Sequence, residues 1–160
     1  MILNCRPVFL IVVVIFALLM LPLFAADESV TVNNNLSFGT MFPGIPKSVD
    51  KNSASAAEFS VGGDAGAEVT LDFNLPTYLS SGSNNMQIIF YSDGCSIDSN
   101  ATPNQSSPTY DDLNPWQTLT YDLGSSGLTV WIGGKAIPGI RQPAGSYTAD
   151  IILTVLYTGL

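Results

Sequence analysis

The sequence predicts an all-β protein with an immunoglobulin-like sandwich fold of about seven strands. Apolar residues recur at every second position in most segments of the chain, as they do in strands that bury one face. Gly, Pro, Asn and Asp cluster between these segments, and such clusters are typical of turns. Beyond the N-terminal apolar run, no window shows the 3.6-residue spacing of an amphipathic helix. Short strands separated by frequent turns are the sequence pattern of a β-sandwich.

The segments with alternating apolar residues are short and follow one another closely. They cover residues 30–32, 36–38, 57–61, 67–73, 86–90, 119–123, 128–132 and 147–158. Residues 64–66 lie between two of these segments and are predicted to form the turn of a β-hairpin. Residues 92–116 break the pattern with Asn, Ser, Pro and Asp. We expect a long irregular loop there, which is an insertion, a functional loop or a partly disordered segment.

The last segment, residues 147–158, is the longest predicted strand. Six apolar side chains recur at every second position and share one face: Tyr147, Ala149, Ile151, Leu153, Val155 and Tyr157. Strands are usually about 5–6 residues long, so this one needs a second sheet to cover its apolar face. Its outer edge also needs a partner, because an exposed apolar edge is a template for aggregation. That partner is either residues 30–32 or a strand from another molecule.

Residues 1–26 have the layout of a secretory signal peptide. A short head with Arg6 precedes an apolar run over residues 8–24, and the small residues Ala25 and Ala26 follow. This is the order of basic region, apolar region and cleavage site. An uncleaved membrane anchor is the alternative, but the run barely reaches the roughly 17–25 residues of a spanning helix. We expect cleavage after Ala25 or Ala26 and export of a single domain, residues 27–160, through the inner membrane to the periplasm, cell surface or a fimbrium.

The composition is that of an acidic exported protein. The chain has 5 Lys and Arg against 13 Asp and Glu, and loss of Arg6 with the signal peptide lowers the net charge from −8 to −9. This balance argues against nucleic acid and anionic membrane surfaces, because both bind clustered basic residues. Cys95 is the single cysteine beyond the signal peptide. It is therefore free, buried or paired between molecules.

The sequence offers little catalytic chemistry. The chain has no His, which removes the usual general base of serine and cysteine triads and the commonest metal ligand. Carboxylates lie close together at Asp111 and Asp112, and at Asp93 and Asp98 on either side of Cys95. Glycoside hydrolysis needs two carboxylates across a cleft, and calcium usually needs a regular ligand spacing that is missing here. We expect solvated loop charges, no enzymatic activity, no cofactor and no metal.

Three parts of the chain carry recognisable motifs. They are LSFGT (36–40) with PG (43–44), FSVGGDAG (59–66), and WIGG (131–134) with QPAGSYT (142–148). These motifs resemble a family of bacterial exported β-sandwich domains of unknown function, which is similar to spore coat protein U and to chaperone–usher fimbrial subunits. The resemblance covers most of the exported chain except residues 92–116, and QPAGSYT is its most specific part. The motif positions are carried over as structural markers: Gly39, Gly133, Gly134, Pro143, Gly145 and Tyr147.

The resemblance implies an immunoglobulin-like subunit that lacks a final strand. Pilins of this kind are completed by a strand from a periplasmic chaperone or from a neighbouring subunit, which is a form of β-strand addition. The implied partners are therefore a chaperone, an usher and neighbouring subunits. Only residues 27–35 precede the first motif, and residues 33–35 are all Asn. This subunit is thus better suited to accept a strand than to donate one.

Two functional hypotheses follow. The first is a structural subunit of a fimbria-like or cell-surface assembly, joined by β-strand addition at the edge of residues 147–158. The second is a self-complete secreted binding module that recognises a surface glycan or protein through the 92–116 loop, because loops on a rigid sandwich often carry recognition.

Overall fold

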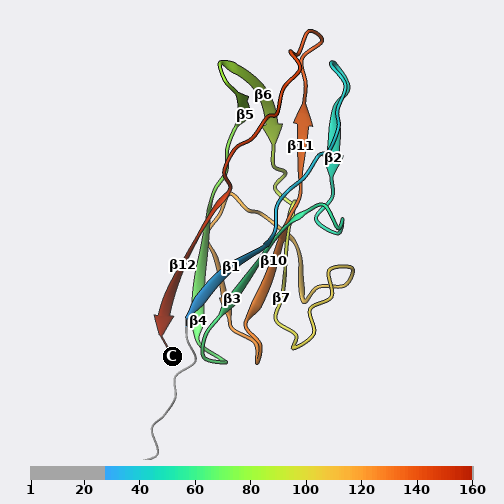
Figure 1. Ribbon diagram of the computed structural model, residues 1–160. Helices are drawn as coiled ribbons and strands as arrows, with labels where there is room; N and C mark the ends of the chain where they lie inside the picture. Colours follow the sequence, from blue (N-terminus) through green and yellow to red (C-terminus); the bar gives the residue numbers. More distant parts are fainter. Residues whose placement is uncertain (1–27, 160) are drawn as a thin grey trace, which may run out of the picture.

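The computed structural model describes residues 28–159 as an elongated β-protein (Figure 1). The all-β prediction is confirmed, since this part of the chain forms antiparallel sheets and contains no helical residue. The predicted signal peptide, residues 1–26, lies outside the described residues. Within residues 28–159 there is also no helix with the length and hydropathy needed to cross a membrane.

The strands form three sheets, called A, B and C below. Sheet A has five strands in the order β1 (Ser29–Asn34), β3 (Ala57–Gly62), β10 (Leu128–Ile132), β7 (Cys95–Asp98) and β8 (Tyr110–Leu113). Sheet B has the order β2 (Lys47–Val49), β11 (Gly134–Ile137), β6 (Asn84–Ile89) and β5 (Tyr78–Ser81). Sheet C has the order β12 (Ile152–Gly159), β4 (Glu68–Asn74) and β9 (Leu119–Asp122).

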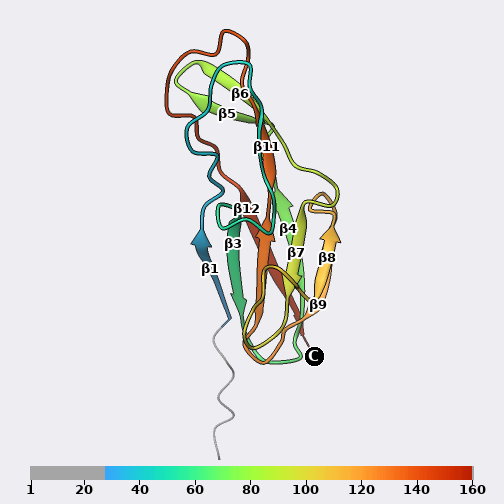
Figure 2. The ribbon, with the colours of Figure 1, turned by 90° about the vertical axis from the view of Figure 1, so that its right-hand side faces the viewer.

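Sheets A and C form the two layers of the sandwich. Figure 2 shows the strands of sheet A in one layer, with β12 and β4 of sheet C behind them. The core between them contains apolar side chains from alternate strand positions, such as Val61, Val130 and Leu71, which are at most 1% exposed. Phe59 of sheet A and Phe73 of sheet C meet edge to face with ring centroids 6.1 Å apart. Burial of these alternating faces supplies the main stabilising contribution to the fold.

Sheet B forms the other end of the elongated molecule (Figure 1). Its β11 follows β10 of sheet A after a single residue, Gly133. A side chain at Gly133 would place its Cβ 2.5 Å from the Val49 carbonyl oxygen and 2.7 Å from the Lys51 nitrogen. The chain can therefore pass from one sheet to the other only because this residue lacks a Cβ.

The number and limits of the strands differ from the sequence prediction. Residues 36–38 are not a strand, whereas β2, β5 and β11 lie in segments rich in Gly, Pro and Ser where no strand was expected. The segment 92–116, expected to be irregular, contains β7 and β8. β7 has only four residues, CSID, and all four are buried. A run this short shows too few repeats to be recognised by its period.

The hairpin predicted around residues 64–66 is wrong. The strands on either side, β3 and β4, belong to sheets A and C respectively. The connection therefore crosses from one layer of the sandwich to the other. Alternation identifies the strand faces on either side of a short turn but does not distinguish a hairpin from such a crossing.

Candidate functional site

β12 is an edge strand of sheet C. Among the described strands it pairs only with β4, in an antiparallel register that runs from Ile152 opposite Asn74 to Gly159 opposite Glu68. Its other edge faces the side of the molecule where β1 lies (Figures 1 and 2). The predicted strand over residues 147–158 thus begins later than expected, at Ile152.

The inner face of β12 is only partly covered. Its side chains lie opposite apolar residues of β4, namely Leu153 opposite Phe73, Val155 opposite Leu71 and Tyr157 opposite Val69. Directly opposed residues of an antiparallel pair share one face of the sheet. Leu71 and Val69 are fully buried, yet Val155 and Tyr157 remain half-buried. The apolar face of β12 is therefore less completely covered than that of its neighbour β4.

β1 shows the same incomplete burial from the opposite layer. Val30 lies opposite Val61 of β3, and Val32 lies opposite Phe59. Both β3 residues are buried in the core, but Val30 is 46% exposed and Val32 is 57% exposed. Two valines that point into the sandwich thus remain open to solvent.

β1 does not close the edge of β12. The sequence left open whether residues 30–32 would do so, and the structure pairs them with β3 in sheet A instead. β1 and β12 are each the outermost strand of their sheet. They lie on the same side of the sandwich, because the Tyr157 hydroxyl of β12 donates a 2.6 Å hydrogen bond to the Gly62 carbonyl of β3, the strand beside β1. The gap between them is the open side of the molecule.

A groove of about 1040 Å³ extends from this open side toward sheet B. One wall is formed by Val32 and residues 34–43, and the other by residues 142–151. Its floor includes Phe59 of β3 and Ile88 of β6. The only Asp, Glu, Lys or Arg side chain among its lining residues is Asp150. Such a groove suits an extended apolar segment better than a charged small molecule.

The six residues predicted to share one strand face divide into two groups. Leu153, Val155 and Tyr157 lie on β12, whereas Tyr147, Ala149 and Ile151 precede the strand and line the groove. The chain leaves sheet C in this segment, because Thr148 exchanges backbone hydrogen bonds of 2.8 and 3.0 Å with Ser80 of β5. The apolar alternation therefore begins at Tyr147, five residues before the pairing of β12 with β4 begins at Ile152.

Four motif residues line the same groove, namely Gly39, Pro143, Gly145 and Tyr147, whereas Gly133 and Gly134 lie where β10 passes into β11. Gly39 has a φ of +59°, a left-handed conformation that favours glycine. The hydroxyl of Tyr147 donates a 2.8 Å hydrogen bond to the carbonyl of Pro143. Pro143 and Gly145 line the groove wall, and Gly134 opens β11.

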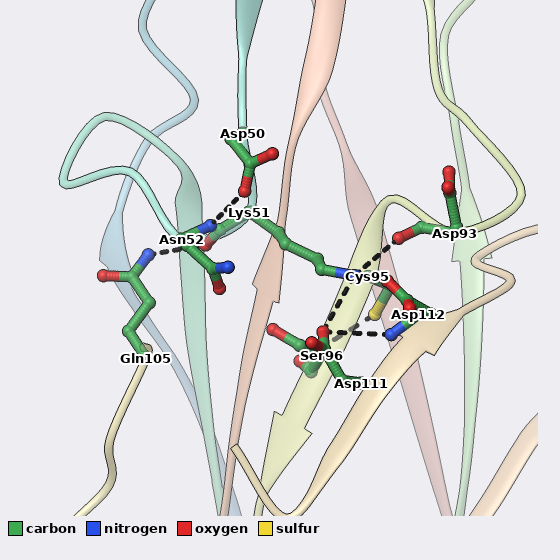
Figure 3. A network of polar contacts seen from close by, with 9 residues as sticks. All are labelled: Asp50, Lys51, Asn52, Asp93, Cys95, Ser96, Gln105, Asp111 and Asp112. Atoms are coloured by element: carbon green, nitrogen blue, oxygen red, sulfur yellow. Dashed lines mark hydrogen bonds and ion pairs between the residues drawn. The ribbon is translucent and has the colours of Figure 1, made fainter. Parts of the chain in front are cut away.

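Lys51 joins three loops at the side of the sandwich (Figure 3). Its side chain is buried, and its Nζ donates to the Asp93 carbonyl at 2.8 Å while forming ion pairs with Asp111 at 2.8 Å and with Asp112. The expectation that Asp111 and Asp112 are merely solvated loop charges is therefore wrong. Both carboxylates remain partly exposed, but they hold β8 against the segment that contains Lys51.

The ionisation of this cluster follows from its contacts. Burial alone would lower the pKa of Lys51, but the hydrogen bonds to Asp111 and Asp112 raise its pKa above the ordinary value. The same hydrogen bond to Lys51 lowers the pKa of Asp111. A charged lysine held by two carboxylates is a structural tie and a poor nucleophile, because its lone pair is protonated.

Asp98 anchors the connection between β7 and β8, a role that the sequence did not reveal. Its fully buried carboxylate accepts hydrogen bonds from the Thr109 hydroxyl at 2.6 Å, from the Asn104 backbone at 2.7 Å and from the Asn100 side chain at 2.6 Å. Burial alone would raise the pKa of Asp98, but these hydrogen bonds lower its pKa below the ordinary value. The available signal was the Asp-x-Asn pattern at 98–100, which is typical of an Asx-turn.

The same connection covers the outer face of sheet A. The Gln105 side chain donates to the carbonyls of Lys51 and Ser53 at 2.6 and 2.9 Å. Because β10 lies between β7 and β3 in the sheet, residues 99–109 cross it to reach that point (Figure 2). Trp131 of β10 is consequently only 3% exposed.

The remaining polar chemistry is limited in this part of the chain. Cys95 is fully buried, and burial raises its pKa to about 12. The thiolate that reacts with electrophiles is therefore scarce at neutral pH. Among residues 28–159, no group of three or more His, Cys, Asp and Glu side chains is placed to hold a metal ion.

No family model matches the chain, and no curated protein matches it.

Proposed function

We propose that the protein is a structural subunit of an extracytoplasmic, fimbria-like or cell-surface assembly, and that it accepts an extended strand between β1 and β12. The proposal includes export by the predicted signal peptide and partners that carry the strand, which are a periplasmic chaperone, an usher complex or neighbouring subunits. It rests on the architecture and on the motif resemblance described above.

One observation carries the proposal, which is the shared gap in the two layers. The valines of β1 and the inner residues of β12 point into the same sandwich, yet Val30 and Val32 stay exposed and Leu153, Val155 and Tyr157 stay half-buried. Conventional edge strands protect themselves with charges, Pro or bulges. The inward positions of β12 from Leu153 to Tyr157 carry no charge and no Pro, and the irregularity of its register lies only at its end, between Tyr157 and Gly159.

An added strand would pair with the unpaired backbone edge of β12 and would also bury the apolar side chains that are still exposed. Its backbone would pair with the open edge of β12, and its alternate side chains would cover the inner faces of β12 and β1. Full burial of one large apolar side chain contributes about 1.5–3 kcal/mol. The cost of ordering the incoming segment offsets part of that gain. Several alternating apolar side chains are thus required for stable binding.

The test uses a synthetic peptide as long as β12, 8 residues, with alternating Thr and Val. Binding should raise the midpoint of thermal unfolding and slow hydrogen exchange of β12 backbone amides, because a ligand of the folded state stabilises it. A peptide of the same composition with its valines placed consecutively is the control. It should have little effect, since its apolar side chains point to both faces.

Two neighbouring positions on β1 provide matched variants. Val32→Asp places a charge on the inward face beside the gap, while Thr31→Asp places the same charge on the outward face opposite Ser60. Both residues are exposed, so both variants should fold. Val32→Asp should abolish stabilisation by the alternating peptide, and Thr31→Asp should preserve it. Equal effects of the two variants would contradict the proposed site.

The 92–116 segment has less support as a recognition loop. Its connection is tied to the domain through Asp98 and Gln105, and its Trp116 donates its indole N–H to the Phe90 carbonyl at 3.0 Å. These contacts fit a cover over sheet A. The strand-accepting subunit is therefore the function that the geometry supports best.

A further inference from the structure

The two ends of the molecule carry opposite charge. Sheet B and the loops at its outer end, residues 35–46, 82–83 and 138–149, contain no Asp or Glu. The same region contains Lys47, Lys135 and Arg141. All Asp and Glu side chains of the described residues lie outside it. In a chain with 13 acidic and 5 basic residues, this segregation creates a strong charge asymmetry along the long axis.

Three large apolar side chains are exposed at the basic end. Phe42 is 66% exposed, Ile45 is 60% exposed and Ile140 is 89% exposed. They belong to two loops that touch, because the Gly44 nitrogen donates to the Gly139 carbonyl at 3.0 Å. We call Phe42, Ile45 and Ile140 the apolar tip. Arg141 and Lys47, both exposed, lie within two residues of it in sequence.

The opposite end is acidic, and we define it by Glu28, Asp64, Glu68 and Asp122. These residues lie where β1, β4 and β9 begin or end, far from sheet B (Figure 1). Glu68 and Asp122 are directly opposed on neighbouring strands. Like charges in that arrangement destabilise a sheet pair, so a cationic group docked between them would relieve repulsion. The strand-end segments 62–68 and 122–127 contain no Lys or Arg.

We propose that the apolar tip of one copy docks on the acidic end of a second copy. The exposed apolar side chains, flanked only by basic residues, need a partner with apolar contact area and negative charge. The protein's own opposite end supplies that charge. An anionic membrane fits less well, because the net charge of the whole chain is −8. A head-to-tail contact between opposite ends is heterologous, and such contacts extend into filaments unless the rotation closes a ring.

This contact is separate from strand addition and does not require it. Strand addition uses the open side between β1 and β12, whereas the docking uses the two ends of the long axis (Figure 1). Phe42 is the one tip residue that also lines the groove; Ile45 and Ile140 do not. The tip is small, so the contact belongs to the class of weak interfaces. It would orient neighbouring subunits along their axes, and its electrostatic part should weaken with added salt.

The test is sedimentation velocity of the purified exported protein over a range of protein concentrations. Association should be visible at low ionic strength and reduced at about 0.15 M salt, where the Debye length falls to about 8 Å. Lys47→Glu with Arg141→Glu should lower the association constant by about tenfold or more, because like charges then face each other. Glu68→Lys with Asp122→Lys should have the same effect.

Mixing the two charge-reversed proteins should restore association. In the mixture a negative tip meets a positive end, and a positive tip meets a negative end. Misfolding of a variant cannot produce this rescue. The mixing experiment therefore remains decisive even if one variant loses stability. Ile140→Ser should weaken association, while Ile152→Ser, at a 52% exposed isoleucine on β12, should not.

Two results would overturn the proposal. One is the absence of concentration-dependent association at low salt, and the other is an association constant that neither charge reversal changes. Tip-dependent binding to anionic phospholipid vesicles without self-association would also overturn it. The alternating peptide should stabilise the Lys47→Glu, Arg141→Glu protein as much as the unaltered one. Failure of docking and failure of strand addition are therefore distinguishable.

Discussion

β10 and β12 carry similar apolar side chains on their inner faces, yet only β10 is sealed. Leu128, Val130 and Ile132 of β10 are at most 1% exposed. The inward residues of β12 remain half-buried. β10 has a strand on both sides, β3 and β7, whereas β12 has one described neighbour, β4.

This difference between β10 and β12 shows that the alternation of apolar residues and the burial of their side chains have separate causes. Alternation determines which side chains face the interior, because it sets the face of the strand. Neighbouring strands decide how much of that face is removed from water. The closed side has an additional cover, residues 99–109, over the outer face of sheet A. The open side lacks an equivalent cover within the described residues.

The largest expected effect on stability is at Leu71 of β4, a strand with a neighbour on both sides. Leu71 is fully buried, and Leu→Ala at such a position costs about 2–5 kcal/mol through lost burial and the cavity left behind. Denaturant unfolding of Leu71→Ala should therefore show a large fall in the free energy of unfolding. A loss no larger than that caused by Leu153→Ala on β12 would contradict the distinction between a strand with two neighbours and an edge strand.

Asp98→Asn tests the cover on the closed side and should cost about 2–3 kcal/mol. Hydrogen bonds to a charged group contribute about 1.5–3 kcal/mol, and Asp98 accepts several from residues 100–109. An amide at this position would direct N–H groups toward donors. Thermal unfolding measures the loss, and faster proteolysis within residues 99–109 would locate it. Asp72→Asn, at a carboxylate that accepts one exposed hydrogen bond from Thr118, is the control.

The Asp98 contribution should depend on pH in one direction. Hydrogen bonds hold the pKa of Asp98 below its ordinary value of 3.8 in the folded protein. The contribution is therefore fully present above that value and is lost as the pH falls through the lower folded-state pKa. The difference in unfolding free energy between the unaltered protein and Asp98→Asn should narrow below about pH 4. A difference that widens there would contradict this ionisation.

Leu153→Ala tests the open side and should cost about 1 kcal/mol, since only part of this side chain is removed from water. Leu153 lies opposite Phe73 across β12 and β4 and on the same face of sheet C as Leu71, so it is a matched leucine on the adjacent strand. With the alternating peptide bound, the loss should increase, because the added strand would complete the burial of Leu153. Chemical denaturation with and without peptide measures both values. An unchanged loss would mean that the peptide binds elsewhere.

The faces of the long alternating strands could be predicted from sequence. β3, β4 and β10 were recognised because apolar residues such as Phe59, Val69 and Val130 follow the period of two in their sequences. The short strands of sheet B could not be recognised, because a run such as Gly134–Ile137 is too brief to show a period. β7 was missed because its four residues are also too few to show a period within a polar segment.

The candidate site was predictable only in part. The apolar character of Leu153, Val155 and Tyr157 indicated an inward face, but the partner of β1 depends on contacts distant in sequence. Alternation gives no information on whether Val32 joins sheet A or sheet C. Likewise, nothing near Lys51 indicated its ion pairs with Asp111 and Asp112, which are about 60 residues away along the chain.

Val32→Thr should have the smallest effect on the stability of the protein alone, and it should show the clearest difference between the free and the peptide-bound protein. Val32 is 57% exposed, and threonine keeps the β-branched shape that strands favour. In the protein alone, the change in unfolding free energy should stay within about 0.5 kcal/mol, as for most surface substitutions. With the alternating peptide present, the hydroxyl would face an apolar strand, so peptide affinity should fall severalfold. Thr31→Val on the outward face is the control and should leave affinity unchanged. Measured by peptide titration, a loss confined to Val32→Thr would show that an exposed valine belongs to an interior that another strand completes.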